Sequence, residues 1–139
     1  MAISKKKFRE VLFQMIYARD HNAVCDDFLI LLAVQTMKVS KKTARLVRDK
    51  VAEVEACLPQ IDAKLTKHLE HYSLEEISRI EKNVLRLGLY ALFYETDLPP
   101  EVAIAEAIRV CCKFGSVEGA KFVNAVLDGV YKELEKHAS

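Results

Sequence analysis

The chain has 139 residues, a formal net charge of +1 and 51% apolar residues, with only four Gly and three Pro. This composition excludes a disordered or fibrous protein, and no apolar run approaches the roughly 20 residues of a membrane-spanning helix. The basic N-terminus leads into an amphipathic segment and not into the apolar core of a signal peptide. We therefore expect one cytoplasmic domain over residues 1–139, with no membrane contact.

The overall charge conceals an asymmetry along the chain. Residues 1–50 contain eleven Lys and Arg against five Asp and Glu, a balance of +6, so the remaining residues sum to −5. Such a distribution is typical of a protein with one face for a polyanion.

Helical periodicity runs along nearly the whole chain, and alternating strand patterns are rare. Ser4 is expected to cap a first helix, in which Phe8, Leu12 and Met15 form part of a core-facing stripe. A second helix is predicted over residues 26–37, with inward side chains at Phe28, Leu29, Leu32 and Val34.

Ser40 is expected to cap a third helix, and Pro59 to begin a short fourth one, because proline suits the first turn. The segment Ser73-Leu-Glu-Glu76 has the form of a capping box and predicts the start of the longest helix, which would run to about residue 95.

Pro100 suits the start of a sixth helix that ends at Gly115, and Ser116 is expected to cap the last one. Seven helices joined by short turns predict a compact all-α bundle. If it divides into two subbundles, the division is expected at the break near residues 72–74.

The first helix has a second face that the core stripe does not explain. At about 100° per residue, Lys6, Phe13 and Tyr17 lie opposite Phe8 and Leu12. Lysines beside aromatic rings suit single-stranded RNA, since cations neutralise phosphates and rings stack on bases. The alternative is that Phe13 and Tyr17 pack against another helix and the lysines are only solvated.

No pattern favours catalysis or metal binding. The sequence has no Gly-rich phosphate loop and no nucleophile elbow, so we expect no enzyme and no cofactor. His68, His71 and Glu75 are the best metal candidates, but the predicted helix break at Ser73 spoils their geometry. The four cysteines lack metal-ligand spacing and are expected to be reduced thiols: Cys25, Cys57, Cys111 and Cys112.

Several ordered segments resemble the NusB family of transcription antitermination factors. Residues 80–90 (IEKNVLRLGLY), 98–108 (LPPEVAIAEAI), 113–115 (KFG) and 121–128 (KFVNAVLD) match that family in order and spacing. Arg9, Glu10, Gln14 and Tyr17 match its first helix.

This resemblance implies a bacterial, non-enzymatic RNA-binding protein. Such a factor binds boxA RNA together with the ribosomal protein NusE. It then joins an antitermination complex on RNA polymerase and supports ribosomal RNA transcription.

The resemblance also implies roles for particular residues. RNA contacts map onto the first helix and onto the start of the last: Lys5, Lys6, Lys7, Arg9, Tyr17, Glu118, Lys121 and Phe122. Tyr17 and Glu81 match positions at the partner surface.

This chain also departs from the family pattern. The lysine-rich start replaces an arginine-rich one, and lysine lacks arginine's bidentate fork. Ala105 stands where the family often has Asn, and Ala125, where it often has Gly, is expected to add a methyl at a close packing site.

Three questions stay open at this point. One alternative function is a helical protein-interaction module that binds RNA weakly or not at all. Another is the related helical domain of some RNA cytosine methyltransferases, which is disfavoured because no catalytic domain follows Ser139. The chain is either a monomer or a homodimer that hides its RNA face.

Overall fold

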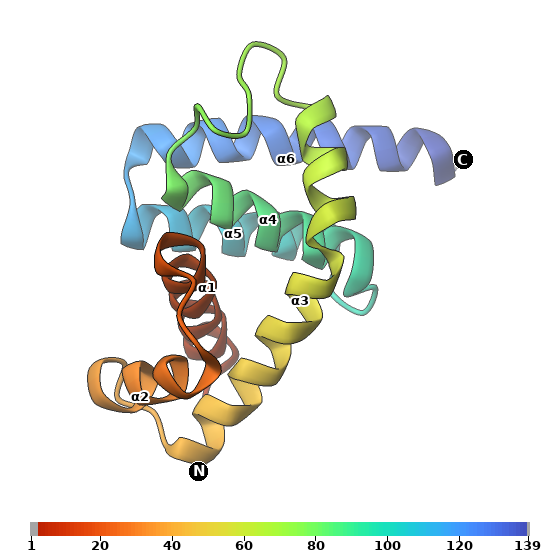
Figure 1. Ribbon diagram of the computed structural model, residues 1–139. Helices are drawn as coiled ribbons and strands as arrows, with labels where there is room; N and C mark the ends of the chain where they lie inside the picture. Colours follow the sequence, from red (N-terminus) through yellow and green to blue (C-terminus); the bar gives the residue numbers. More distant parts are fainter. Residues whose placement is uncertain (1–2, 139) are drawn as a thin grey trace. The chain divides into compact units, whose positions relative to one another are not determined.

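The computed structural model describes residues 3–138, and within this range it contains six helices and no strand (Figure 1). The all-α prediction is confirmed, with one helix fewer than expected. Met1, Ala2 and Ser139 belong to the predicted domain but lie outside the described residues. The helices are α1 (Lys5–Asn22), α2 (Asp26–Thr36), α3 (Lys41–Lys67), α4 (Arg79–Tyr94), α5 (Pro100–Phe114) and α6 (Val117–Ala138).

The chain forms two compact units, the first ending at Ala56 and the second beginning at Cys57. The division falls inside α3 and not at the expected break near residues 72–74. Buried residues occur along α3 on both sides of this division. Val51 and Val54 belong to the first unit, Ile61 and Leu65 to the second, and each is 0% exposed.

Pro59 lies inside α3, so the prediction that it begins a new helix is wrong. An interior proline costs about 3 kcal/mol, because it removes a backbone hydrogen bond and clashes with the preceding turn. Burying a side chain such as Val54 or Ile61 stabilises the fold by about 1.5–3 kcal/mol. Both residues are fully buried, so packing on either side of Pro59 offsets its cost.

The start of α4 was also predicted wrongly. Ser73 and Glu76 do interact, since the Ser73 backbone N–H donates to Glu76 Oε1 at 3.0 Å, but they form only a turn. Hydrogen bonds from the backbone and side chain of Ser73 lower the pKa of Glu76. The helix begins at a second capping box five residues later. There Ser78 Oγ accepts from the Glu81 N–H at 3.1 Å and donates to Glu81 Oε2 at 2.8 Å.

The other predicted serine caps are confirmed. Ser4, Ser40 and Ser116 each accept a hydrogen bond from the backbone N–H three residues later, at 3.1, 3.1 and 2.9 Å. Each satisfies one of the four N–H groups that a helix start leaves without a backbone partner. These boundaries follow from local chemistry alone.

In the first unit, Arg19 joins three segments. Its guanidinium donates to Glu55 Oε2 of α3 at 3.1 Å, to the carbonyl of Val24 at 2.6 Å, and to Asp26 at the start of α2. Burial opposes the charged form, but Asp26 and Glu55 together raise the pKa of Arg19 above its ordinary value. The α1–α2 connection turns at Ala23, which has a left-handed backbone (φ 52°).

Only part of the predicted inner face of α2 is buried. Leu29 is 0% exposed, but Phe28 is 45% and Val34 is 36% exposed. Apolar residues surround this helix, so periodicity alone could not select the face that packs.

In the second unit, α4, α5 and α6 pack against one another (Figure 1). Gly88 of α4 allows the close approach of α6. A Cβ atom at this position would lie 2.9 Å from Leu127 Cδ1, and Leu127 is fully buried.

The two capping boxes respond differently to loss of the serine. Ser78→Ala should lower the free energy of unfolding by about 1 kcal/mol, because the first turn of α4 loses its cap. Ser73→Ala should change it by less than about 0.5 kcal/mol, because no helix follows that exposed turn. Urea unfolding of the two variants measures both values. A larger loss for Ser73→Ala would contradict this assignment of the helix start.

Two glycine substitutions test the packing of α6. Gly88→Ala should lower the free energy of unfolding by about 1–3 kcal/mol, because the new methyl overlaps Leu127. Gly129→Ala is the control. Its nearest neighbour would be His68 Cδ2 at 3.8 Å, an ordinary contact, so the better helix propensity of alanine should stabilise by up to about 1 kcal/mol. In thermal and urea unfolding, the stability of the two variants should therefore shift in opposite directions from that of the unmodified protein. Equal shifts for Gly88→Ala and Gly129→Ala would refute the close approach at Gly88.

Candidate nucleic-acid interface

The first candidate surface is the start of α1. Lys5 and Lys6 are exposed, whereas Lys7 and Arg9 are half-buried. The first turn contains no acidic residue. Cations at this end of a helix are repelled by the macrodipole, and each destabilises the helix by about 0.3–1 kcal/mol when no anion is near. An anionic ligand near these residues would relieve that repulsion.

A row of aromatic rings continues along α1 at a spacing of four residues. The Phe13 and Tyr17 ring centroids are 5.9 Å apart, and Tyr17 stacks on His21 at 6.2 Å with an interplanar angle of 11°. Phe13 is only 2% exposed, so it packs inside the protein and is not a stacking surface. Tyr17 is half-buried and His21 is exposed. The sequence reading missed His21, although its spacing from Tyr17 was the available signal.

Lys6 and Tyr17 share one side of α1. They are eleven residues apart, which places them within about 20° around the axis and about 16 Å along it. Phe8, which was expected in the core stripe, is half-buried. A ligand that contacts both Lys6 and Tyr17 must therefore be extended.

The second candidate surface lies in the second unit, where Glu81 meets the start of α6. The Ser78 hydroxyl holds the Glu81 carboxylate at 2.8 Å. A Cβ atom at Gly119 would lie 3.2 Å from the carboxyl carbon of Glu81 and 3.1 Å from Ser116 Oγ. The absence of a side chain at Gly119 thus leaves room for Glu81 beside the first turn of α6.

The residues of α6 predicted to contact RNA lie in its first two turns. Glu118 and Lys121 are exposed and Phe122 is half-buried. The ring of Tyr72 meets Phe122 edge-on, with centroids 6.0 Å apart, and Tyr72 is 53% exposed. Sequence reasoning missed Tyr72, because nothing in its local pattern indicates that the turn before α4 reaches α6.

Glu81 also affects a nearby thiol. Burial raises the pKa of Cys111, and the negative charge of Glu81 raises it further. Cys111 is 0% exposed. A buried thiol that stays protonated is a poor nucleophile, so its environment is that of a structural cysteine.

The remaining sequence expectations can also be located. Ala105 and Ala125 are both exposed, so the expectation that the Ala125 methyl adds to a close packing site within the chain is wrong. His68 is engaged by Glu133 Oε2 at 2.7 Å. Over residues 3–138, no group of three or more His, Cys, Asp or Glu side chains is arranged to hold a metal ion. None of the helices in that range is both long and apolar enough to cross a membrane.

The fold and these surfaces define an all-α protein whose first helix begins with a cationic surface. The NusB family profile matches residues 6–132. The chain belongs to the NusB family, whose members are transcription antitermination proteins.

Individual relatives cover nearly the whole chain. The transcription antitermination protein NusB of Fervidobacterium nodosum is 34% identical over 136 residues, covering 96% of this chain and 94% of the relative. That of Pseudothermotoga lettingae is 33% identical over 135 residues, covering 94% and 92%.

Solved structures agree with this. The structure of T. maritima NusB superimposes with a TM-score of 0.81 at 30% identity, covering 96% of this chain and 94% of that one. A crystal structure of the antitermination factors NusB and NusE in complex with double-stranded RNA matches with a TM-score of 0.80 at 25% identity, covering 93% and 96%.

Proposed function

We propose that this protein binds boxA-type RNA together with the ribosomal protein NusE and joins an antitermination complex on RNA polymerase, supporting ribosomal RNA transcription in the cytoplasm. Its two units act as one RNA-binding domain, and it needs no cofactor and catalyses no reaction. The observation that carries the proposal is the cationic first turn of α1, which contains no acidic residue. The solved relative that contains NusE and RNA supports it.

In this proposal, the start of α1 holds the RNA backbone. Lys5, Lys6, Lys7 and Arg9 neutralise phosphates, and Tyr17 offers a ring to an unstacked base. Lysine is a point charge, so these contacts give affinity more than geometric selectivity. Sequence preference for boxA then has to come from elsewhere on the RNA-binding surface.

The start of α6 is proposed to add such contacts. Lys121 suits a phosphate, and Phe122 with Tyr72 forms an aromatic pair on which a base can stack. Glu118 cannot bind phosphate, because both are anionic. Its carboxylate is suited to accept hydrogen bonds from a base amino group or a ribose 2′-hydroxyl.

Glu81 and Tyr17 are proposed to contact NusE. Glu81 is held by Ser78 against α6, so its carboxylate is oriented before the partner arrives. Bound NusE then adds to the surface that binds RNA, so NusE raises the affinity for RNA. By linkage, RNA raises the affinity for NusE by the same factor. If the protein forms a homodimer that covers the α1 surface, dimer formation would compete with the binding of RNA and NusE. Sedimentation would then show that RNA converts dimer to monomer.

The main test is the salt dependence of RNA binding. Lys5→Ala/Lys6→Ala/Lys7→Ala should bind boxA RNA more weakly and make the slope of log K against log salt shallower by about 2, because each lost phosphate contact removes about 0.7. Mobility shifts with boxA and scrambled RNA, each with and without NusE, give these slopes.

The matched control replaces three exposed lysines outside α1, namely Lys42, Lys67 and Lys132, with Ala. It has the same net charge as the test variant and should keep the original slope. An unchanged slope in the α1 variant would reject the role of these lysines. If NusE binding survives high salt and nuclease while boxA is never preferred, the protein is an interaction module and not an RNA-binding factor.

A second test concerns the partner surface. Glu81→Gln should weaken NusE binding about threefold to tenfold, because a hydrogen-bonded charge is lost. Gly119→Ala should weaken it similarly by displacing Glu81, and the two effects should not add, because they act on one group. Calorimetric titration with NusE measures this. Gly129→Ala, the same change on α6 in open space, should bind normally. Additive losses would show that Gly119 acts independently of Glu81.

A further inference from the structure

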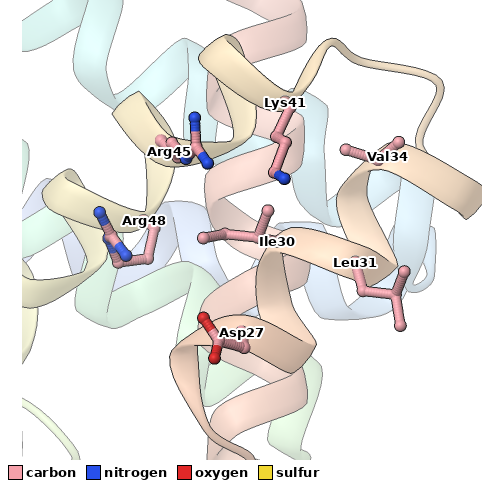
Figure 2. Close-up of a pocket in the computed structure, with 7 residues that line it drawn as sticks. All are labelled: Asp27, Ile30, Leu31, Val34, Lys41, Arg45 and Arg48. Atoms are coloured by element: carbon pink, nitrogen blue, oxygen red, sulfur yellow. The ribbon is translucent and has the colours of Figure 1, made fainter.

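The first unit contains a groove of about 570 Å³ between α2 and α3, which none of the proposed RNA or NusE contacts uses (Figure 2). The α2 side is mainly aliphatic, with Ile30, Leu31 and Val34. The α3 side is cationic, with Lys41, Arg45 and Arg48. We call this cavity the α2–α3 groove.

The aliphatic wall is more open to solvent than a core face. Leu31 is 49% and Val34 is 36% exposed, whereas Ile30 is 9% exposed and forms the floor. The sequence pattern predicted Val34 to face inward. Neighbouring exposed apolar side chains are typical of a surface that another molecule covers.

The cationic wall has a regular spacing. Lys41, Arg45 and Arg48 occur at i, i+4 and i+7, so they form one row along α3 (Figure 2). Arg48 has a neighbouring carboxylate, with Asp49 Oδ1 3.0 Å from its Nε. Among the described residues that line the groove, Asp27 is the only acidic one. Within residues 3–138, neither Lys41 nor Arg45 is paired with an acid.

This cationic row begins at the N-terminus of α3, where the helix dipole disfavours positive charge. The first turn of α3 has no acidic residue, so Lys41 opposes the macrodipole as the lysines of α1 do. Three cations face the groove against one carboxylate. Charge complementarity therefore calls for an anionic occupant, and the aliphatic wall calls for an apolar one.

We infer that the α2–α3 groove binds an amphipathic helix of a partner protein, with an apolar stripe that packs on Leu31 and Val34 and carboxylates that pair with Lys41, Arg45 and Arg48. The row from residue 41 to 48 is about 10 Å long, which matches two turns of such a helix. RNA fits less well, because the described residues that line the groove include no aromatic ring to stack on a base. The inference does not depend on the proposed RNA function, since it uses other residues.

The test uses a designed fluorescent peptide of about 20 residues, long enough to be helical alone, with leucines on one stripe and glutamates beside it. A sibling peptide has Gln for each Glu, and a single-stranded RNA serves as a third probe. Fluorescence anisotropy with the full chain measures each affinity. The Glu peptide should bind at least about tenfold more tightly than the Gln peptide, because only it can pair with the cationic wall.

Matched variants then locate the site. Lys41→Glu and Arg45→Glu should each weaken Glu-peptide binding about tenfold, whereas Lys42→Glu should change it less than about twofold. Lys42 lies in the same first turn of α3 and is exposed, but it does not line the groove. Lys41→Glu and Lys42→Glu reverse a charge in the same first turn of α3, so their shared effects on folding cancel.

The aliphatic wall has its own control. Leu31→Asp should weaken binding about tenfold, because a carboxylate replaces an apolar contact in a groove whose ligand is anionic. Leu46→Asp should not, although Leu46 is 55% exposed on α3, because it does not line the groove. Leu31→Ser is the milder alternative if thermal melting shows that Leu31→Asp unfolds.

Three results would overturn the inference. One is that neither peptide binds. Another is that Lys41→Glu and Lys42→Glu weaken binding equally, which indicates unspecific attraction. The third is that Lys41→Glu and Arg45→Glu weaken the RNA probe but not the peptide, which would make the groove a phosphate-binding surface.

Discussion

The second unit depends on a largely buried arginine, Arg86, and its ion pair with a half-buried carboxylate, Asp62. Arg86 of α4 is 9% exposed and forms a two-pronged contact with Asp62 of α3, at 2.9 Å from Nε and 2.8 Å from Nη2. Its Nη1 donates to Asn83 Oδ1 at 3.2 Å. A guanidinium this far from water must be neutralised and hydrogen-bonded, because leaving it without its carboxylate costs about 3–5 kcal/mol. The pair therefore fixes how α4 is rotated against the C-terminal half of α3.

The rotation of α4 in turn sets its contacts with α6. Glu81 and Gly88 are seven residues apart and lie on nearly the same side of the helix. Glu81 meets Gly119 at the start of α6, and Gly88 meets Leu127 eight residues further on. A different rotation would turn Glu81 away from α6 and place a larger side chain against Leu127. The geometry of the candidate partner surface thus follows from an interaction inside the second unit, between α3 and α4.

The sequence predicted what local chemistry decides and missed what tertiary packing decides. Ser4, Ser40 and Ser116 were predicted as caps because each needs only a nearby N–H group. Pro59 was misread because burial along α3 outweighs a local helix-start signal. Ser73 was misread because Glu76 can accept from the Ser73 N–H in a turn that no helix follows. Helical spacing located the face of α1 that includes Tyr17. Periodicity does not show what covers a face, so the sequence could not decide whether Phe13 binds RNA or packs against another helix. Tyr72 reaches Phe122 only through the fold.

Two helices of the first unit begin with cations and no acids, and their surroundings distinguish them. On the same side of α1 as Lys6, about 16 Å further along the helix, the candidate contact surface is aromatic, with Tyr17 stacked on His21. Beside Lys41 of α3 it is aliphatic, with Leu31 and Val34 across the groove. Repulsion from the helix dipole is similar in both places, so charge alone would predict the same ligand. The uncharged neighbours separate them, because rings suit the flat faces of bases and branched aliphatic chains suit the apolar stripe of a helix.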